Sequence, residues 1–181
     1  MKQPEIIVIV HNIRSTHNVG SIFRTCEGFG VKKIILSGYT PVPLSSTGSD
    51  PVEKRLPHEA AKITAQIHKT ALGAETMVPF DYHHTLDLTC PEFAGYTFVA
   101  LEQSDRSVTL QHYRPPTNIA LLLGEEVDGI KDKLLAQCDS VVEIPMRGKK
   151  ESFNVSVATG IALYAITTGA ASRHEAPPGA T

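Results

Sequence analysis

Three stretches of the chain place glycines and polar residues after an apolar run of strand length. They read NVGSIFRTCEGFGV (residues 18–31), LLLGEEVDGI (residues 121–130) and IPMRGKKESFNVSVATGIALY (residues 144–164). Their polar side chains include Asn18 and Arg24 in the first stretch, two adjacent glutamates, Glu125 and Glu126, in the second, and a helix start rich in Ser and Asn, with Ser152 and Asn154, in the third. The planar fork of a guanidinium binds a phosphate or a developing alkoxide, whereas its pKa above about 12 makes it a poor base. The chemistry indicated is positioning of a polar substrate and stabilisation of its charge.

The sequence lacks several other catalytic motifs. No GxGxxG follows the first apolar run, and neither a GxxxxGK[ST] P-loop nor a GxSxG nucleophile elbow occurs. The eight histidines do not show the spacing of metal ligands, and the three cysteines, Cys26, Cys90 and Cys138, form no CxxC pair. We therefore expect no metal site and no disulfide framework, with the cysteines as reduced bystanders.

Apolar patterns predict the elements that must position these side chains. β-Branched runs such as EIIVIV are typical of buried strands, and apolar residues at helical spacing predict helices between them. The predicted strands are 5–10, 33–37, 76–80, 96–101, 118–123 and 141–144. The predicted helices are 19–29, about 58–70, 84–94, 131–137 and 154–168, the first with Asn18 as N-cap and Gly30 after its end. This alternation predicts an α/β fold with a mostly parallel sheet and helices on both faces.

The position of the polar stretches after strands predicts one common site. In an open α/β sheet, ligands bind beyond the carboxyl ends of the strands, so we expect the three stretches to meet there. Residues 38–57, which contain four prolines, predict a long exposed loop. With 181 residues and 41% hydrophobic content, the chain is expected to form a single domain over residues 1–170, followed by a flexible tail over residues 171–181.

Charge and hydropathy restrict the classes of partner. A net charge of −2 argues against a protein that binds nucleic acid through bulk electrostatics. Local basic residues remain, and they are Arg14, Arg24, Lys32, Lys33, Arg147, Lys149 and Lys150. No apolar run reaches the roughly 20 residues of a membrane span, and the first residues do not have a signal-peptide pattern. We expect a cytoplasmic protein that does not bind membranes.

In this order, the three stretches resemble the three motifs of the SpoU (TrmH-type) RNA 2′-O-ribose methyltransferases of the SPOUT superfamily. The resemblance covers most of residues 5–169, and KTALGAETMVP (residues 69–79) is similar to the family's middle segment. It implies an α/β domain with a deep C-terminal trefoil knot, a homodimer, and S-adenosylmethionine bound by the knotted loops. The implied reaction is methyl transfer, without a metal, to a ribose 2′-hydroxyl of structured RNA, either tRNA or rRNA.

Matching positions give the site residues their implied roles. By resemblance, the methyl donor contacts Leu101, Gly124, Ile144, Ser152 and Phe153. The implied catalytic set is Arg24, Asn18, Glu126, Ser152 and Asn154. We expect Arg24 to place a phosphate and stabilise the alkoxide, Asn18 to position Arg24 or the ribose, and Glu126 to hold Arg24 or a neighbouring loop.

Two positions depart from the family's pattern, and two other functions stay open. Phe153 replaces a commoner leucine and reshapes the pocket, while Glu125 adds a carboxylate where a small residue is frequent. A carboxylate there repels phosphates unless it points away or meets a base; the alternative is an exposed loop charge. The other functions are a catalytically silent RNA-binding or ribosome-assembly protein and a base methyltransferase. The arginine of the first motif and the SFNVS segment favour ribose methylation.

Overall fold

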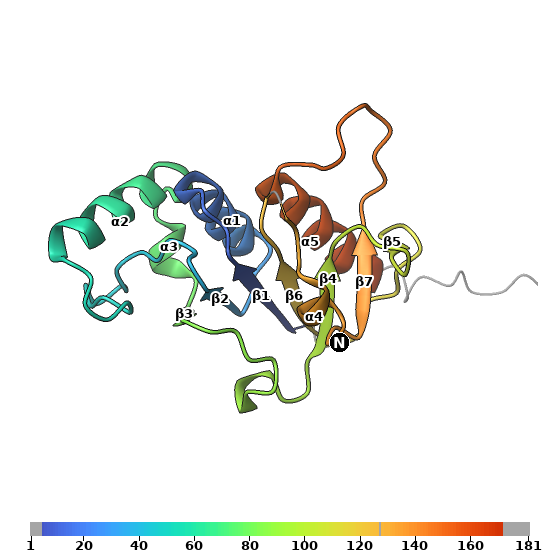
Figure 1. Cartoon of the computed structure of the whole chain (residues 1–181), viewed down its shortest axis with the longest axis horizontal. Coiled ribbons are helices and arrows are strands. Elements are labelled where there is room, and N and C mark those ends of the chain that lie inside the picture. The colour runs from blue at the N-terminus through green and yellow to red at the C-terminus, as the bar shows by residue number, and fades with distance from the viewer. Residues whose placement is uncertain (1–4, 127, 172–181) are drawn as a thin grey trace, which may run out of the picture.

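The apolar runs of the sequence form the strands of one sheet in the computed structural model, which describes residues 5–126 and 128–171 (Figure 1). The strands are β1 (Glu5–His11), β2 (Lys33–Ser37), β3 (Phe80–His83), β4 (Thr97–Leu101), β5 (Val108–Thr109), β6 (Asn118–Leu123) and β7 (Ser140–Glu143). The helices are α1 (Thr16–Gly28), α2 (Pro57–Ala71), α3 (Ala74–Met77), α4 (Asp132–Leu135) and α5 (Val155–Ala171), and η1 (Pro91–Phe93) is a 3₁₀ turn. The strand positions are filled by apolar side chains because both faces of the sheet are covered.

The strands lie in the order β3-β2-β1-β6-β4-β7-β5, and every pairing between them is parallel. The prediction of a mostly parallel sheet is confirmed. From β1 the chain builds outward through β2 to β3, and it then builds the opposite half of the sheet, so the strand order reverses between β1 and β6. Such a reversal opens a crevice at the carboxyl ends of the strands. The loops that follow β1, β4, β6 and β7 all begin at this edge.

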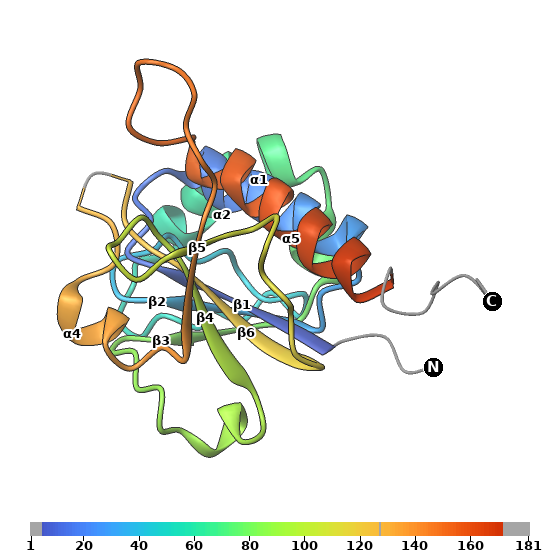
Figure 2. The same ribbon diagram turned by 90° about the vertical axis from the view of Figure 1, so that its right-hand side faces the viewer.

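The two faces of the sheet are covered by different kinds of structure. One face packs against α1, α2 and α5 through a core that includes Phe23, Ile67 and Leu163. The other face packs against α4 and the segment between β3 and β4, through residues such as Leu88 and Leu135. Figure 2 shows the three long helices together on one side of the sheet. Helices therefore lie on both faces, but most of the helical structure lies on one.

Most predicted elements are present within one or two residues of their expected bounds, but the predicted strand 76–80 is wrong. Residues Ala74–Met77 form the short helix α3, and β3 begins only at Phe80. Pro79 separates the two elements, and because a proline has no backbone N–H it favours the start of a strand over its interior. The sequence analysis also missed the two-residue strand β5.

The predicted helix 84–94 is also wrong, because only η1 forms there. The carboxylate of Asp87 accepts hydrogen bonds from the amide and the hydroxyl of Thr89, at 2.9 and 2.7 Å, which gives the backbone a local alternative to a helix. Pro91 two residues later cannot donate a helical hydrogen bond. The segment is therefore irregular, and its apolar residues cover the sheet without helical periodicity.

Helix α1 begins earlier than predicted. Its N-cap is Ser15, whose hydroxyl accepts a hydrogen bond from the amide of Asn18 at 3.2 Å. Asn18 therefore lies in the first helical turn, and its side chain is available for other contacts. The predicted stop is confirmed, since Gly30 follows the helix with φ +64° and its amide donates to the carbonyl of Glu27.

The loop 38–57 is less exposed than predicted. Val42 is fully buried, and the guanidinium of Arg55 ties the loop together by donating to the Val42 carbonyl at 2.8 Å and to both carboxylate oxygens of Asp50. Apart from Ala171, the predicted tail 171–181 lies outside the described residues. Within the described parts of the chain, no helix has the length and apolar character needed to cross a membrane.

Candidate functional site

A cleft opens at the carboxyl edge of β4, β6 and β7. Its walls come from the loops after these strands and from the start of α5, and they include all five residues expected to contact the methyl donor: Leu101, Gly124, Ile144, Ser152 and Phe153. These residues come from positions as far apart in the sequence as 101 and 153, yet they face one cavity. Glu126 also lines this cleft. The assigned roles stay predictions, but the structure brings these residues together.

Gly124 is buried where two parts of the second motif touch. A Cβ at this position would lie 2.7 Å from the carbonyl carbon of Gly129 and 2.8 Å from the amide nitrogen of Ile130, both of which are backbone atoms. A larger residue at position 124 would therefore displace the 125–130 loop, because its side chain meets the loop backbone directly. Only glycine allows this loop to fold back directly over the end of β6.

Glu102 fixes the other end of the same loop. Its carboxylate accepts hydrogen bonds from the amide of Ile130 at 2.8 Å and from the amide of Gln103 at 2.9 Å. Gln103 in turn donates to the carbonyl of Glu151 at 2.6 Å, so it connects the β4 loop to the long loop before α5. Both residues line the cleft, and sequence analysis missed them. The available signal was their position directly after a predicted buried strand.

Asn18, Glu126 and Asn154 form one chain of hydrogen bonds. The amide nitrogen of the Asn18 side chain donates to Glu126 Oε1 at 3.0 Å, and the Asn18 side-chain oxygen accepts from Asn154 Nδ2 at 3.1 Å. The second oxygen of Glu126 accepts from the backbone amide of Arg14 at 3.4 Å. This network joins α1 to the β6 loop and to the start of α5, both of which lie more than 100 residues after Asn18 in the sequence.

Asn154 has a second role in local structure. Its side-chain oxygen accepts a hydrogen bond from the amide of Ser156 at 3.0 Å, so Asn154 caps α5 while its nitrogen binds Asn18. Ser152 precedes it in an exposed stretch at the rim of the cleft. The two polar residues at this helix start therefore differ in their surroundings: Asn154 is a cap and a bridge, whereas Ser152 faces the cleft.

Arg24 does not join this network. It lies on α1 six residues beyond Asn18, which corresponds to about 9 Å along the helix axis. Its side chain is exposed, it does not line the cleft, and within the described residues it forms no hydrogen bond or ion pair. Within the described part of one chain, neither Asn18 nor Glu126 contacts Arg24. Of the two roles expected for Glu126, its hydrogen bonds favour holding the neighbouring loop.

Glu125 is not the exposed loop charge considered above, because its side chain is only 7% exposed. Its carboxylate accepts a hydrogen bond from the hydroxyl of Tyr39 and another from Arg14 Nη2 at 2.8 Å. The guanidinium of Arg14 also lies over the Tyr39 ring, 5.4 Å from its centre. The Tyr39 hydrogen bond, supported by Arg14, lowers the pKa of Glu125 below its ordinary 4.5 despite partial desolvation. At neutral pH the Glu125 carboxylate is therefore ionised, and the Arg14 guanidinium balances its negative charge.

The basic residues divide into paired and unpaired groups. Besides Arg14, two of the N-terminal cations face carboxylates: Lys32 binds Glu5 at 2.6 Å, and Lys33 binds Asp81. In contrast, the basic residues of the loop before α5 are exposed and form no ion pair among the described residues; they are Arg147, Lys149 and Lys150. Of the basic residues named in the sequence analysis, those without an ion pair among the described residues are therefore Arg24 on α1 and the three on this loop, which leads into the cleft at Ser152 and Phe153.

The parallel sheet, the order reversal, the cleft lined by the second and third motifs and the hydrogen bond that ties the first motif to Glu126 define the class of protein. The chain belongs to the SpoU rRNA Methylase family, whose family model matches residues 5–164. The match includes all three polar stretches of the sequence and all of the predicted site residues, so the resemblance to this family is confirmed.

Two curated relatives show how the chain compares with whole proteins of the family. It is 29% identical over 167 residues to the 23S rRNA (guanosine-2′-O-)-methyltransferase RlmB of Coxiella burnetii, and 30% identical over 165 residues to the RlmB of Neisseria meningitidis. Each alignment covers 90% of this chain and 58% of the relative. The chain therefore spans little more than half the length of these relatives.

Solved structures are similar over almost the whole chain. An AdoMet-bound rRNA methyltransferase from Sinorhizobium meliloti superposes with a TM-score of 0.73 at 25% identity, covering 97% of this chain and 59% of the other. The TrmH/SpoU tRNA modifying enzyme of A. aeolicus superposes with a TM-score of 0.71 at 24% identity, covering 95% and 78%. The second likeness concerns the fold alone.

Proposed function

We propose that this protein transfers a methyl group from S-adenosylmethionine to a ribose 2′-hydroxyl of ribosomal RNA. The observation that carries the proposal is that the second and third motifs line one cleft, and that Glu126 of this cleft is hydrogen-bonded to Asn18 of the first motif, which also binds Asn154. The RlmB relatives are named as methyltransferases of this kind acting on 23S rRNA, which favours rRNA over tRNA. With such a substrate, the protein would work in the cytoplasm.

The cleft fits the proposed methyl donor. Apolar side chains of Leu101, Ile144 and Phe153 offer a surface for a flat base, and Gly124 lines the cleft beside them. When bound, the donor supplies an electrophilic methyl group on a sulfonium. Glu102 and Glu126 add negative charge to the walls, which suits a cationic ligand. No residue set of this cleft calls for a metal.

The network of Asn18, Glu126 and Asn154 positions the acceptor instead of removing its proton. Both oxygens of Glu126 already accept hydrogen bonds, one from Asn18 and one from the Arg14 amide, so this carboxylate holds loops in place. The ribose oxygen forms a bond to the methyl carbon while the C–S bond of the donor breaks, which leaves S-adenosylhomocysteine, and the hydroxyl proton passes to water. Where proton loss runs ahead of C–O bond formation, the oxygen carries partial negative charge. A guanidinium stabilises that charge, which is the role proposed for Arg24.

Arg24 would perform this role in a homodimer. The exposed apolar residues of α5 form a stripe at helical spacing, namely Val157, Ile161 and Tyr164, with Phe153 just before the helix. Since α5 packs beside α1, a second copy seated on this stripe would lie next to the exposed Arg24. We infer that Arg24 acts on the cleft of the partner subunit, because it does not reach the cleft of its own chain.

The topology also supports the expected trefoil knot. The chain leaves β4, forms β5 at the sheet edge and returns to β6 on the opposite side of β4. Then β7 enters between β4 and β5, and α5 packs beside α1 on one face of the sheet. We infer that this last passage threads the loop 102–117. Because all strands share one sheet, we retain residues 1–170 as a single domain.

The proposal is tested by supplying the purified protein with methyl-labelled S-adenosylmethionine and either 23S rRNA or tRNA. We expect label in 2′-O-methylated nucleosides of the rRNA after complete digestion and mass spectrometry. Asn18→Ala should reduce the rate, whereas Lys62→Ala, an exposed cation on α2, should not. Methylation of a base would contradict the proposal. Donor binding without transfer to either RNA would instead favour the catalytically silent RNA-binding protein.

A further inference from the structure

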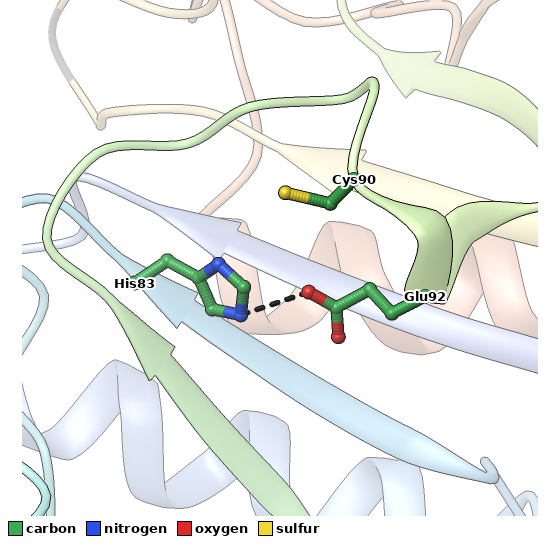
Figure 3. Close-up of side chains that lie close together, drawn as sticks. All are labelled: His83, Cys90 and Glu92. Atoms are coloured by element: carbon green, nitrogen blue, oxygen red, sulfur yellow. Dashed lines mark ion pairs between the residues drawn. The ribbon is translucent and has the colours of Figure 1, made fainter.

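A second cluster of reactive side chains lies away from the cleft, where β3 ends and the segment toward β4 begins. His83 is the last residue of β3, and Cys90 and Glu92 flank Pro91 at η1 (Figure 3). One ligand atom from each residue lies within 4.8 Å of the others, and His83 Nε2 is 2.9 Å from Glu92 Oε1. All three residues are half-buried, so they are neither sealed in the core nor fully solvated.

These three residue types form a ligand set for a divalent transition metal. Thiolate, imidazole and carboxylate groups all bind Zn²⁺, at bond lengths of about 2.0–2.3 Å, so neighbouring ligands of one ion lie roughly 3.5 Å apart. Small side-chain rotations bring the present atoms to this spacing. The thiol excludes hard cations such as Mg²⁺ or Ca²⁺ as the preferred ion. We propose that His83, Cys90 and Glu92 bind one zinc ion, with a fourth position open to water.

The surroundings hold the three ligands in place. Asp87 forms its turn with Thr89 just before the cysteine, and the Cys90 amide donates to the Asp87 carbonyl at 3.3 Å. Lys33 lies 3.8 Å from Glu92, but it approaches Oε2, whereas His83 approaches Oε1. The lysine therefore orients the carboxylate without occupying the space between the three ligands. Such supporting contacts are typical of built metal sites.

The ion would fix the segment between β3 and β4, which covers one face of the sheet, to the end of β3. Between β3 and β4 the chain has almost no regular structure, yet Leu88 and Phe93 are buried against the sheet. A metal bond between the end of β3 and η1 closes a loop of about ten residues and restricts the unfolded chain. This role is structural, and it is independent of methyl transfer.

The test uses the full chain after treatment with a chelator. Titration with ZnCl₂ in a calorimeter should show one ion per chain, and titration with CoCl₂ should produce a thiolate-to-cobalt charge-transfer band. Cys90→Ser should abolish the band, and Cys90→Ser, His83→Ala and Glu92→Gln should each weaken Zn²⁺ binding at least tenfold. His84→Ala is the matched control, because His84 is exposed, lies next to His83 and is not part of the cluster. It should bind as the wild type does.

Two results would overturn the proposal. One is the lack of saturable Zn²⁺ binding and of a cobalt charge-transfer band in the wild-type chain, a measurement that needs no variant. The other is binding that the three substitutions leave unchanged, which would place the ion elsewhere. Circular dichroism and thermal melts in chelator should show that the variants fold as the wild type does. Zn²⁺ should then raise the melting temperature of the wild type and of His84→Ala, and not that of Cys90→Ser.

Discussion

Replacing Arg24 with alanine should separate catalysis from stability. The side chain is exposed and has no hydrogen-bond or ion-pair partner among the described residues, so its loss should change the free energy of unfolding by less than about 0.5 kcal/mol. For a chain of this length, that is a shift in melting temperature of no more than about 2 °C. Loss of one preorganised contact to a developing oxyanion instead costs about 10²–10³ in rate, or about 2.7–4 kcal/mol.

The assay is methyl transfer to rRNA under single-turnover conditions, so that product release does not hide the chemical step. Binding of S-adenosylhomocysteine, measured by calorimetry, should stay near the wild-type value, because Arg24 does not line the cleft. Arg24→Lys should recover little activity, since an ammonium keeps the charge and loses the planar fork. Lys62→Ala controls for the general loss of an exposed cation.

Mixed dimers test whether Arg24 serves the partner's cleft. Arg24→Ala and Asn154→Ala chains, each inactive alone, are mixed and allowed to exchange. Random pairing makes about half of the dimers mixed. If Arg24 acts across the interface, each mixed dimer has one intact cleft out of two, so about a quarter of all clefts are restored. If it acts within its own chain, no cleft is restored. Near wild-type transfer by Arg24→Ala alone would refute the role of this arginine altogether.

Three further predictions concern the cleft, the dimer and pH. Gly124→Ala should destabilise the protein by about 1–3 kcal/mol and weaken S-adenosylhomocysteine binding at least tenfold, because its Cβ meets loop backbone. Gly148→Ala should have neither effect, because a Cβ there has nothing within 4 Å. Calorimetric titrations that give Gly124→Ala the affinity of the wild type would contradict the prediction. Ile161→Glu should yield monomers by light scattering, whereas Met77→Glu, at a more exposed apolar site on α3, should not. A dimeric Ile161→Glu would argue against the α5 interface. Burial, the largest cause, lowers the pKa of His11 below its ordinary 6.5. The unfolded chain therefore binds a proton at His11 more readily than the folded chain does, so the free energy of unfolding should fall as pH drops below about 6.5. Between about pH 8 and pH 5, the melting temperature of His11→Gln should fall less than that of the wild type.

The sequence alone was sufficient for the parallel sheet and for the position of the site. Buried β-branched runs and helical periodicity are local properties, and they predicted β1, β2 and β6 and the long helices α2 and α5 within a few residues. The resemblance to the family named Leu101, Gly124, Ile144, Ser152 and Phe153 together, and the structure places these five around one cleft; Asn18, Arg24 and Asn154 do not line it. Local chemistry misled the analysis at 84–94, where an Asp87 turn and Pro91 prevented the helix that the apolar residues indicated.

The partners of individual side chains were decided only by the tertiary structure. Asn18 looked like a helix cap, but Ser15 caps α1 and leaves Asn18 to connect Glu126 with Asn154. Such contacts join residues more than 100 positions apart, and no local pattern encodes which loops meet at the edge of a sheet. The neutralised charge of Glu125 and the cluster at His83, Cys90 and Glu92 have the same origin. The sequence determines the chemistry of each side chain, whereas the order of the strands determines which side chains lie close enough to interact.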